Sequence, residues 1–329
     1  MFIYKKHLSA YMKRKIIRLG RKDRASHLVS MPTSWLKKYN LKQGDEVDVD
    51  FLGNDIVVKA SKGLAVPKEV TIDVTGFEYA YLWRLLNALY TSGVDVIRLK
   101  FEKDTIYDHR IHKEVKLLDV VRQHVQTCMG MEVEEIKKNS CVIRQFSTVI
   151  EEEFEHAFSK TYFIFLQMFE NTVSLLKHYD TEKLSLMEML DSDLDKFTKF
   201  CVRVCNKKGY KDYRRTFYVD DLLGRTESLG DLLDSICRWE LKPKLKVHPK
   251  LVSVFESYLE LYREFYKPFH KYKREDFLKY HKERSRLKDM FASFEAKNAY
   301  DATLLTMVKV VNIELGHMAE AHIQFGFIE

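Results

Sequence analysis

The residues of this chain that could bind a polyanion are concentrated in its first thirty positions. Nine Lys or Arg stand among residues 1–30, together with a single acid, Asp23. This segment carries a formal charge of +8 and the whole chain +7, so the other 299 residues net −1. Arg and Lys contact the phosphate oxygens of DNA, and Arg also reads base edges. A basic excess confined to one short segment therefore indicates binding to nucleic acid, most often DNA.

The candidate DNA-binding residues follow one expected strand and the loop after it. They are Lys13, Arg14, Lys15, Arg18, Arg21, Lys22, Arg24 and Ser26. Arg14 and Arg18 would share a face of the strand, because side chains alternate along a pleated strand. Two copies in a dimer would present on the order of ten cations to a duplex, which predicts binding that weakens steeply with salt. The alternative is a solubilising N-terminus that contacts nothing.

The sequence lacks the motifs of the common enzyme classes. It contains no G-x-S-x-G nucleophile turn, no glycine-rich phosphate loop and no H-E-x-x-H zinc motif. Its 12 glycines in 329 residues are few for a fold that cradles a nucleotide. We therefore expect no catalytic residues and a protein that is not an enzyme.

The cysteines and the hydropathy pattern bear on the compartment. The cysteines are scattered and odd in number, which fits structural thiols in a reducing cytoplasm better than a disulfide framework. They are Cys128, Cys141, Cys201, Cys205 and Cys237. The sequence shows neither a signal peptide nor an uninterrupted run of 18 apolar residues. We therefore expect a cytoplasmic protein that does not span a membrane.

The N-terminal segment, residues 1–62, is expected to form short strands around one short helix. The expected strands are residues 16–19, 27–31, 46–51 and 56–58. Pro32 stands where a first helical turn tolerates a residue without an N–H group. So few large apolar side chains cannot build a good core in one copy. Dimerisation through shared strands would solve this problem.

Residues 67–148 predict a small α/β layer domain with the order βαβαββ. The expected strands are residues 70–74, 94–101, 132–136 and 141–146, and the expected helices are residues 77–90 and 108–129. Gly93 and Gly130 follow the two helices, as is typical of helix ends. We interpret this segment as a linker or regulatory domain.

The region 149–329 has only helical periodicity. Apolar residues step by three and four positions over residues 154–176 and again over residues 187–204. The other expected helices are about residues 220–241, 251–272, 275–296 and 300–323. Two triplets of long helices suggest a duplicated three-helix unit, a bundle of six. The predicted fold class is therefore multidomain α+β.

A second basic run, residues 267–288, contains nine Lys or Arg and three acids. The favoured interpretation is a solvated helix face with ion pairs between neighbouring turns, such as those of Glu283. The alternative is a surface that binds phosphate or an acidic partner.

Residues 14–60 resemble the SpoVT/AbrB (swapped-hairpin) DNA-binding domain. The matching pieces are Arg14-Lys15, Gly20, Val29-Ser30-Met31-Pro32, Ser34-Trp35 and Leu41-Lys42-Gln43-Gly44-Asp45-Glu46-Val47. The resemblance implies that two chains exchange hairpins to form one small β-barrel, so the chain would be a homodimer. The loop from Gly20 to Ser26 is longer and more basic here than is usual in that family.

Residues 150–329 resemble the PhoU family, whose members consist of two three-helix repeats and regulate phosphate uptake. The acids of Asp191-Ser192-Asp193-Leu194-Asp195 match the family's metal-binding motif, and Leu229-Gly230-Asp231 matches a second box. The second repeat departs from the family. Basic residues replace its acids, namely Lys282, Arg284, Arg286 and Lys288, and Leu315-Gly316-His317 stands where Gly-Asp would be.

The PhoU resemblance implies a divalent or iron metal ion at the first repeat, held by Asp191, Asp195 and Asp231. Asp191 and Asp195 stand four positions apart, so they lie one above the other on a helix. Hard cations such as Mg²⁺ and Mn²⁺ need several converging carboxylate oxygens. The other interpretation is that these are exposed acids on solvated helix faces.

The whole layout resembles an archaeal-type phosphate uptake regulator. We expect a DNA-binding transcriptional regulator whose PhoU-like bundle senses or relays phosphate status. Its partners would be duplex DNA, a second copy of the chain, and phosphate-signalling or transporter proteins. One alternative is a PhoU-type interaction protein that controls a membrane phosphate transporter, with the N-terminal module mainly for dimerisation. Another is a metal-dependent enzyme that uses the three aspartates.

Overall fold

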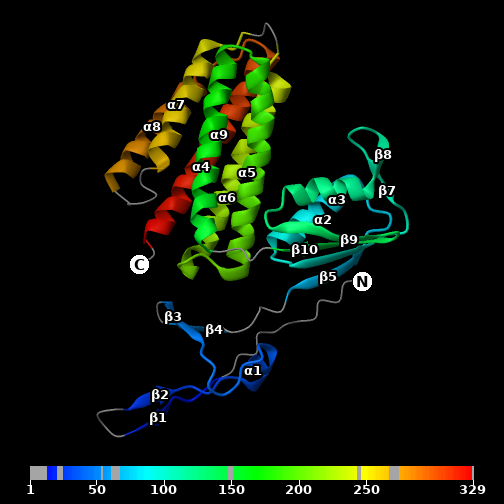
Figure 1. Ribbon diagram of the computed structural model, residues 1–329. Helices are drawn as coiled ribbons and strands as arrows, with labels where there is room; N and C mark the ends of the chain where they lie inside the picture. The colour runs from blue at the N-terminus through cyan, green and yellow to red at the C-terminus, as the bar shows by residue number, and fades with distance from the viewer. Residues whose placement is uncertain are drawn as a thin grey trace. The chain divides into compact units, whose positions relative to one another are not determined.

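The computed structural model describes residues 13–20, 25–52, 55–60, 67–146, 151–242, 246–266 and 274–327. The chain divides into two compact units, Met1–Pro67 and Lys68–Glu329. The fold is mixed α+β, about 61% helical, with small sheets and a helical C-terminal region (Figure 1). The three predicted domains, with boundaries near residues 62 and 148, stay a prediction.

The first unit contains two small hairpins and a short helix. Its elements are β1 (Ile17–Leu19), β2 (Ser26–Leu28), α1 (Thr33–Lys38), β3 (Asp48–Leu52) and β4 (Asp55–Lys59). β1 pairs antiparallel with β2, and β3 pairs antiparallel with β4. Pro32 occupies the N-cap of α1 rather than its first turn, where its lack of an N–H group is equally harmless.

The large apolar side chains whose exposure the structure describes in this unit are exposed or half-buried, with one exception. Among the residues up to Ala60 whose exposure the structure describes, Leu41 is the one large apolar side chain that is buried. The exposed ones are Ile16, Ile17, Leu19, Leu28, Val29, Val49, Phe51 and Ile56, from 46% for Leu28 to 79% for Phe51. A two-stranded hairpin in water is marginally stable at best. One copy of this unit therefore lacks a core of its own in the part that the structure describes.

The second unit begins with a four-stranded sheet in the order β5-β6-β10-β9. Its elements are β5 (Glu69–Asp73), α2 (Tyr79–Thr91), β6 (Val96–Lys100), α3 (Leu117–Gln126), β9 (Met131–Lys137) and β10 (Ser140–Gln145). β5 runs parallel to β6, and β10 runs antiparallel to both β6 and β9. Figure 1 shows α2 and α3 on the same side of this sheet, and their apolar faces share one core with the strands.

The predicted helix over residues 108–129 is wrong in its first part. Two further strands, β7 (Thr105–Asp108) and β8 (Lys113–Lys116), form a hairpin there, and α3 begins only at Leu117. The Asp108 carboxylate accepts hydrogen bonds from the backbone and the guanidinium of Arg110, which closes the turn. His112 has φ 54°, a left-handed conformation that ends helical periodicity.

The six expected helices are confirmed in the described part of the C-terminal region. They are α4 (Glu151–Lys177), α5 (Thr181–Lys208), α6 (Thr216–Ser235), α7 (Pro249–Tyr266), α8 (Arg274–Ala292) and α9 (Ala299–Phe327), with a short π-helical turn (Ile236–Glu240) after α6. Their apolar faces share one continuous core. Of these described helices, none is long and apolar enough to cross a membrane. The five cysteines are free and buried, as structural thiols would be.

A buried arginine joins the helical region to the sheet layer, by which we mean the four-stranded sheet together with α2 and α3. Arg203 on α5 is fully buried, and its guanidinium donates hydrogen bonds to the carbonyls of Tyr90 (2.6 Å) and Val94 (2.9 Å). It also donates to Asp95 Oδ1 (3.0 Å) and Gln145 Oε1 (2.6 Å). These partners come from α2, β10 and the segment between α2 and β6. The sheet layer is thereby anchored to α5.

Candidate functional site

The predicted basic residues that the structure describes lie on the surface. Lys13, Arg14, Lys15 and Arg18 are exposed, and so is Ser26. In the hairpin, Arg18 stands opposite His27 and Leu19 opposite Ser26. β1 begins only at Ile17, so Arg14 precedes the strand. Arg14 and Arg18 therefore do not share a face of β1, contrary to what the alternation of side chains along a strand predicts. The other predicted residues, Arg21, Lys22 and Arg24, lie outside the described residues.

The predicted metal-binding aspartates stand in a row of acids between α5 and α6. Asp191 and Asp195 come from α5 and Asp231 comes from α6. Two further acids of α6, Glu227 and Asp234, belong to the same acidic cluster, because their spacing places them on the helix face of Asp231 and Arg238 contacts both Asp234 and Asp191. We call these five residues the α5–α6 acidic cluster.

Two cations, Lys199 and Arg238, form ion pairs with acids of the cluster. Lys199 Nζ lies 2.6 Å from Asp195 Oδ2. Arg238 Nε donates to Asp234 Oδ2 at 2.6 Å, and its Nη2 lies 3.6 Å from Asp191 Oδ2. Five carboxylates thus face two paired cations, so the cluster keeps an excess of negative charge.

Burial and mutual repulsion raise the carboxyl pKa values in the cluster. Desolvation by burial, followed by the charges of Asp234, Asp195 and Asp231, raises the pKa of Asp191 to about 7. The pKa of Asp231 is raised mainly by burial and then by Asp195. A proton or a bound cation would reduce the repulsion among these carboxylates and would therefore stabilise the cluster.

Asp234 shows an unsatisfied oxygen in the cluster. Asp234 is only 7% exposed, and its Oδ1 atom has no hydrogen-bond partner within the described part of the chain. A buried carboxylate oxygen without a donor costs free energy unless a cation or a proton satisfies it.

A glycine lets the two helices of the cluster approach each other. A Cβ atom added at Gly230 would lie 2.4 Å from Leu194 Cδ2, a side chain that is itself buried. The missing side chain therefore allows α6 to pack closely on α5 immediately beside Asp231. This is a structural reason for a Gly-Asp pair at this point of α6.

The described residues contain no group of three or more His, Cys, Asp or Glu already arranged to hold a metal ion. The metal site at Asp191, Asp195 and Asp231 therefore stays a prediction. Sequence reasoning did not include Glu227 and Asp234 in the site, although their spacing from Asp231 on α6 was a usable signal. Positions four before and three after Asp231 face the same side of a helix.

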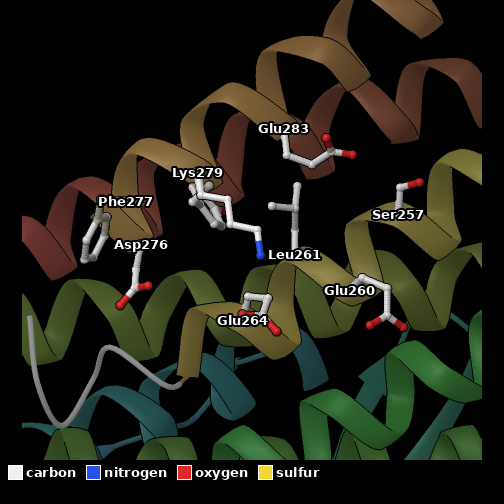
Figure 2. Close-up of a pocket in the computed structure, with 9 residues that line it drawn as sticks. Ser257, Glu260, Leu261, Glu264, Asp276, Phe277, Lys279 and Glu283 are labelled. Atoms are coloured by element: carbon white, nitrogen blue, oxygen red, sulfur yellow. The ribbon is translucent and has the colours of Figure 1, made fainter. Parts of the chain in front are cut away.

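A separate acidic cavity lies between α7 and α8. Its volume is about 390 Å³, and its lining includes Glu260 and Glu264 of α7 and Asp276 and Glu283 of α8, which are labelled in Figure 2. The Lys279 side chain extends from α8 toward Glu264. Phe277 and Leu261 supply apolar wall. The cavity is acidic overall and is unrelated to the predicted metal-binding residues.

Comparison with known proteins adds nothing to these observations, since no protein-family model, curated protein or solved structure matches the chain.

Proposed function

We propose that this protein is a homodimeric DNA-binding transcriptional regulator of phosphate uptake, in which the helical bundle is the sensor or relay. The observation that carries the proposal is the surface of the first unit. This surface carries exposed basic residues together with hairpins whose apolar side chains are exposed to solvent in one copy of the chain.

The exposed hairpins support a dimer built by strand exchange. Phe51 and Ile56 stand opposite each other in the β3–β4 hairpin and are 79% and 64% exposed. Full burial of such a side chain stabilises by about 1.5–3 kcal/mol. A second copy that exchanges hairpins would cover these side chains and supply the core that the first unit lacks.

The exposed cations support contact with a duplex. Lys13, Lys15 and Arg18 surround the start of β1, and the remaining 299 residues of the chain contribute no net positive charge. Phosphate contacts position a protein on DNA, and Arg side chains provide base readout. A dimer doubles the number of cations offered to the two strands.

The bundle supports a sensing role through its acidic cluster. A signal regulates DNA binding only if it favours one arrangement of the paired DNA-binding units over another. The α5–α6 acidic cluster holds excess negative charge and a buried unsatisfied carboxylate oxygen, so its state depends on cations and protons.

The test uses the full chain with Arg14→Gln and Arg18→Gln together, and measures binding to a genomic duplex library by fluorescence anisotropy across a salt series. We expect weaker binding and a salt slope reduced by about 1 for each phosphate that is no longer neutralised. The matched control is Arg122→Gln with Lys137→Gln, which removes two exposed cations from α3 and β9 of the second unit.

Equal reductions in the test and control proteins would contradict the proposal, since binding would then follow total charge alone. A dimer that shows no salt-dependent duplex binding would instead favour a PhoU-type interaction protein that controls a membrane phosphate transporter.

A further inference from the structure

A large basic cavity lies between α8 and α9, on helices that do not contribute to the α5–α6 acidic cluster. Its volume is about 870 Å³. Its lining includes Arg284 and Lys288 of α8 and Lys309 of α9, against one acid, Glu320. Spacings of three and four positions place these residues on one face of each helix. The cavity is therefore cationic, in contrast to the acidic cavity on the other side of α8.

The three cations of this cavity, Arg284, Lys288 and Lys309, form no ion pair in the part of the chain that the structure describes. Neighbouring arginines differ, since Arg286 pairs with Glu283 and Arg225 pairs with Asp221 and Glu314. Uncompensated cations gathered in one concave site attract an anion more strongly than the same charges spread over a surface.

The position of Arg284 is built into the packing of α8 on α9. A Cβ atom added at Gly316 would lie 2.0 Å from Arg284 Nη1, so the guanidinium occupies the space that a side chain on α9 would fill. Arg284 Nη1 donates to the carbonyl of Asn312 at 2.9 Å. This contact holds the guanidinium in place, and its other N–H groups donate to no acceptor among the described residues. Arg binds phosphate in the same forked way as carboxylate.

The rest of the lining indicates an organic ligand rather than a bare ion. Phe291, Ile313 and Ile323 provide apolar wall, and His281 and His317 provide ring nitrogens. Burial, followed by the charge of Arg284, lowers the pKa of His281, so its ring is neutral at pH 7 and offers hydrogen bonds rather than charge. A volume of this size is typical of sites for small organic molecules.

We propose that the α8–α9 cavity binds a phosphorylated small molecule of nucleotide size, with its phosphates on Arg284, Lys288 and Lys309. The apolar wall would hold the body of the ligand. This inference rests on the proposed function in one respect, because it names the class of signal that the bundle would sense. Ligand binding is therefore measured without DNA, so that the two proposals succeed or fail separately.

The experiment is isothermal titration of the full chain with ATP in EDTA, which keeps divalent cations away from the α5–α6 acidic cluster. Adenosine and orthophosphate are titrated in parallel. The test variant is Lys288→Gln with Lys309→Gln, two exposed side chains. The matched control is Lys279→Gln with Lys282→Gln, which removes the same charge from α8 outside the cavity.

We expect ATP to bind the wild-type protein and its affinity to fall about tenfold or more in the test variant, because two charge-assisted hydrogen bonds to phosphate are removed. The control variant should stay within about twofold of wild type, since its charges lie outside the site and are screened by salt. Orthophosphate that competes with ATP would support recognition of the phosphate group itself. Equal reductions in the two variants, competition by adenosine as strong as that by ATP, or no ATP binding below about 1 mM would overturn the proposal.

A second variant tests Arg284 without changing any charge. Gly316→Ala places a methyl group where the guanidinium lies, so Arg284 must move. We expect several-fold weaker ATP binding, whereas Gly224→Ala, at an open position on α6, should leave binding unchanged. Unchanged binding in Gly316→Ala would contradict the placement of phosphate on Arg284.

Discussion

Arg203 and Asp95 lie 108 positions apart in the chain, yet Arg203 Nη2 donates a hydrogen bond to Asp95 Oδ1 at 3.0 Å. The guanidinium is fully buried, while Asp95 is also contacted by Lys207 of α5. Two more residues of the sheet layer, Tyr90 and Val94, accept hydrogen bonds from Arg203 through their carbonyls. One side chain of α5 thus satisfies groups from several parts of the sheet layer.

The first prediction concerns Arg203→Met, which keeps the apolar length of the side chain and removes its donors. We expect a decrease of about 3–5 kcal/mol in the free energy of unfolding, because the carbonyl oxygens of Tyr90 and Val94 lose their buried donor, at about 1–3 kcal/mol each, while Asp95 keeps its contact with Lys207. Urea unfolding followed by circular dichroism measures this. Arg122→Met, which removes an exposed pair at 4.0 Å, should change stability by less than about 1 kcal/mol. Similar values for the two variants would show that the Arg203 hydrogen bonds contribute little.

The second prediction compares two glycines of the same helix. Gly230→Ala forces a methyl group against buried Leu194 and should destabilise by about 1–3 kcal/mol through overpacking. Gly224→Ala meets nothing within 4 Å and should stabilise by up to about 1 kcal/mol, because Ala is the better helix former. Thermal unfolding of both variants gives the comparison. A stabilised Gly230→Ala protein would mean that α5 and α6 separate freely.

The third prediction concerns the pH dependence of stability. The Asp191 carboxyl has a pKa of about 7 in the folded protein against an ordinary value of 3.8. Between these values the folded state binds more protons than the unfolded state, so this group makes stability fall as pH rises from about 4 to about 7. Asp191→Asn should therefore be more stable than wild type at pH 8, by about 1–3 kcal/mol, and equal to it near pH 3.

The control for the pH series is Asp193→Asn, which removes one exposed acid from the same helix. Urea midpoints at several pH values distinguish the two variants. If both variants shift the midpoint equally at pH 8, then general charge rather than the acidic cluster accounts for the effect.

The fourth prediction is that Mn²⁺ binds the α5–α6 acidic cluster. At pH 8, Mn²⁺ at about 100 times its dissociation constant would stabilise the protein by about 2.7 kcal/mol. Asp195→Asn combined with Asp231→Asn should abolish this stabilisation, while Asp193→Asn should retain it. Melting curves in Mn²⁺ and in EDTA provide the measurement, and identical curves for the wild-type protein would refute the metal site.

The fifth prediction addresses the dimer. Phe51→Asp places a charge in the β3–β4 hairpin and should weaken dimerisation by about tenfold or more, since each copy would bury a carboxylate in place of an aromatic ring. Phe217→Asp, at a 72% exposed position on α6, is the control. Sedimentation equilibrium measures both. A monomeric wild-type protein would end the argument for exchanged hairpins.

Sequence reasoning succeeded where one local pattern determined the structure. The three- and four-residue spacing of apolar residues predicted six helices, because each helix buries one continuous face. It failed over residues 105–116, where a hairpin forms in place of the start of a helix. There the chain turns, because Asp108 accepts a hydrogen bond from the backbone of Arg110 and His112 adopts a left-handed conformation. Neither feature appears in the spacing of apolar residues from which the helix was predicted.

The candidate site was predictable in part for the same reason. Asp191 and Asp195 follow from spacing within one helix. The addition of Asp234, and the closure of the cluster by Arg238, depend on how α6 packs against α5. Arg203 shows the limit most clearly. It stands beside the apolar face of α5, and only the tertiary structure reveals that the sheet layer covers it.

Helix α5 carries both the acidic cluster and the anchor of the sheet layer. Asp195 and Arg203 are eight residues apart on this helix, which corresponds to about 12 Å along its axis. The helix has no break between them, so it behaves as one stiff rod over this distance. If neutralising the cluster lets α5 slide against α6, Arg203 moves with Asp195, and the parts of the sheet layer that Arg203 holds are displaced by the same amount.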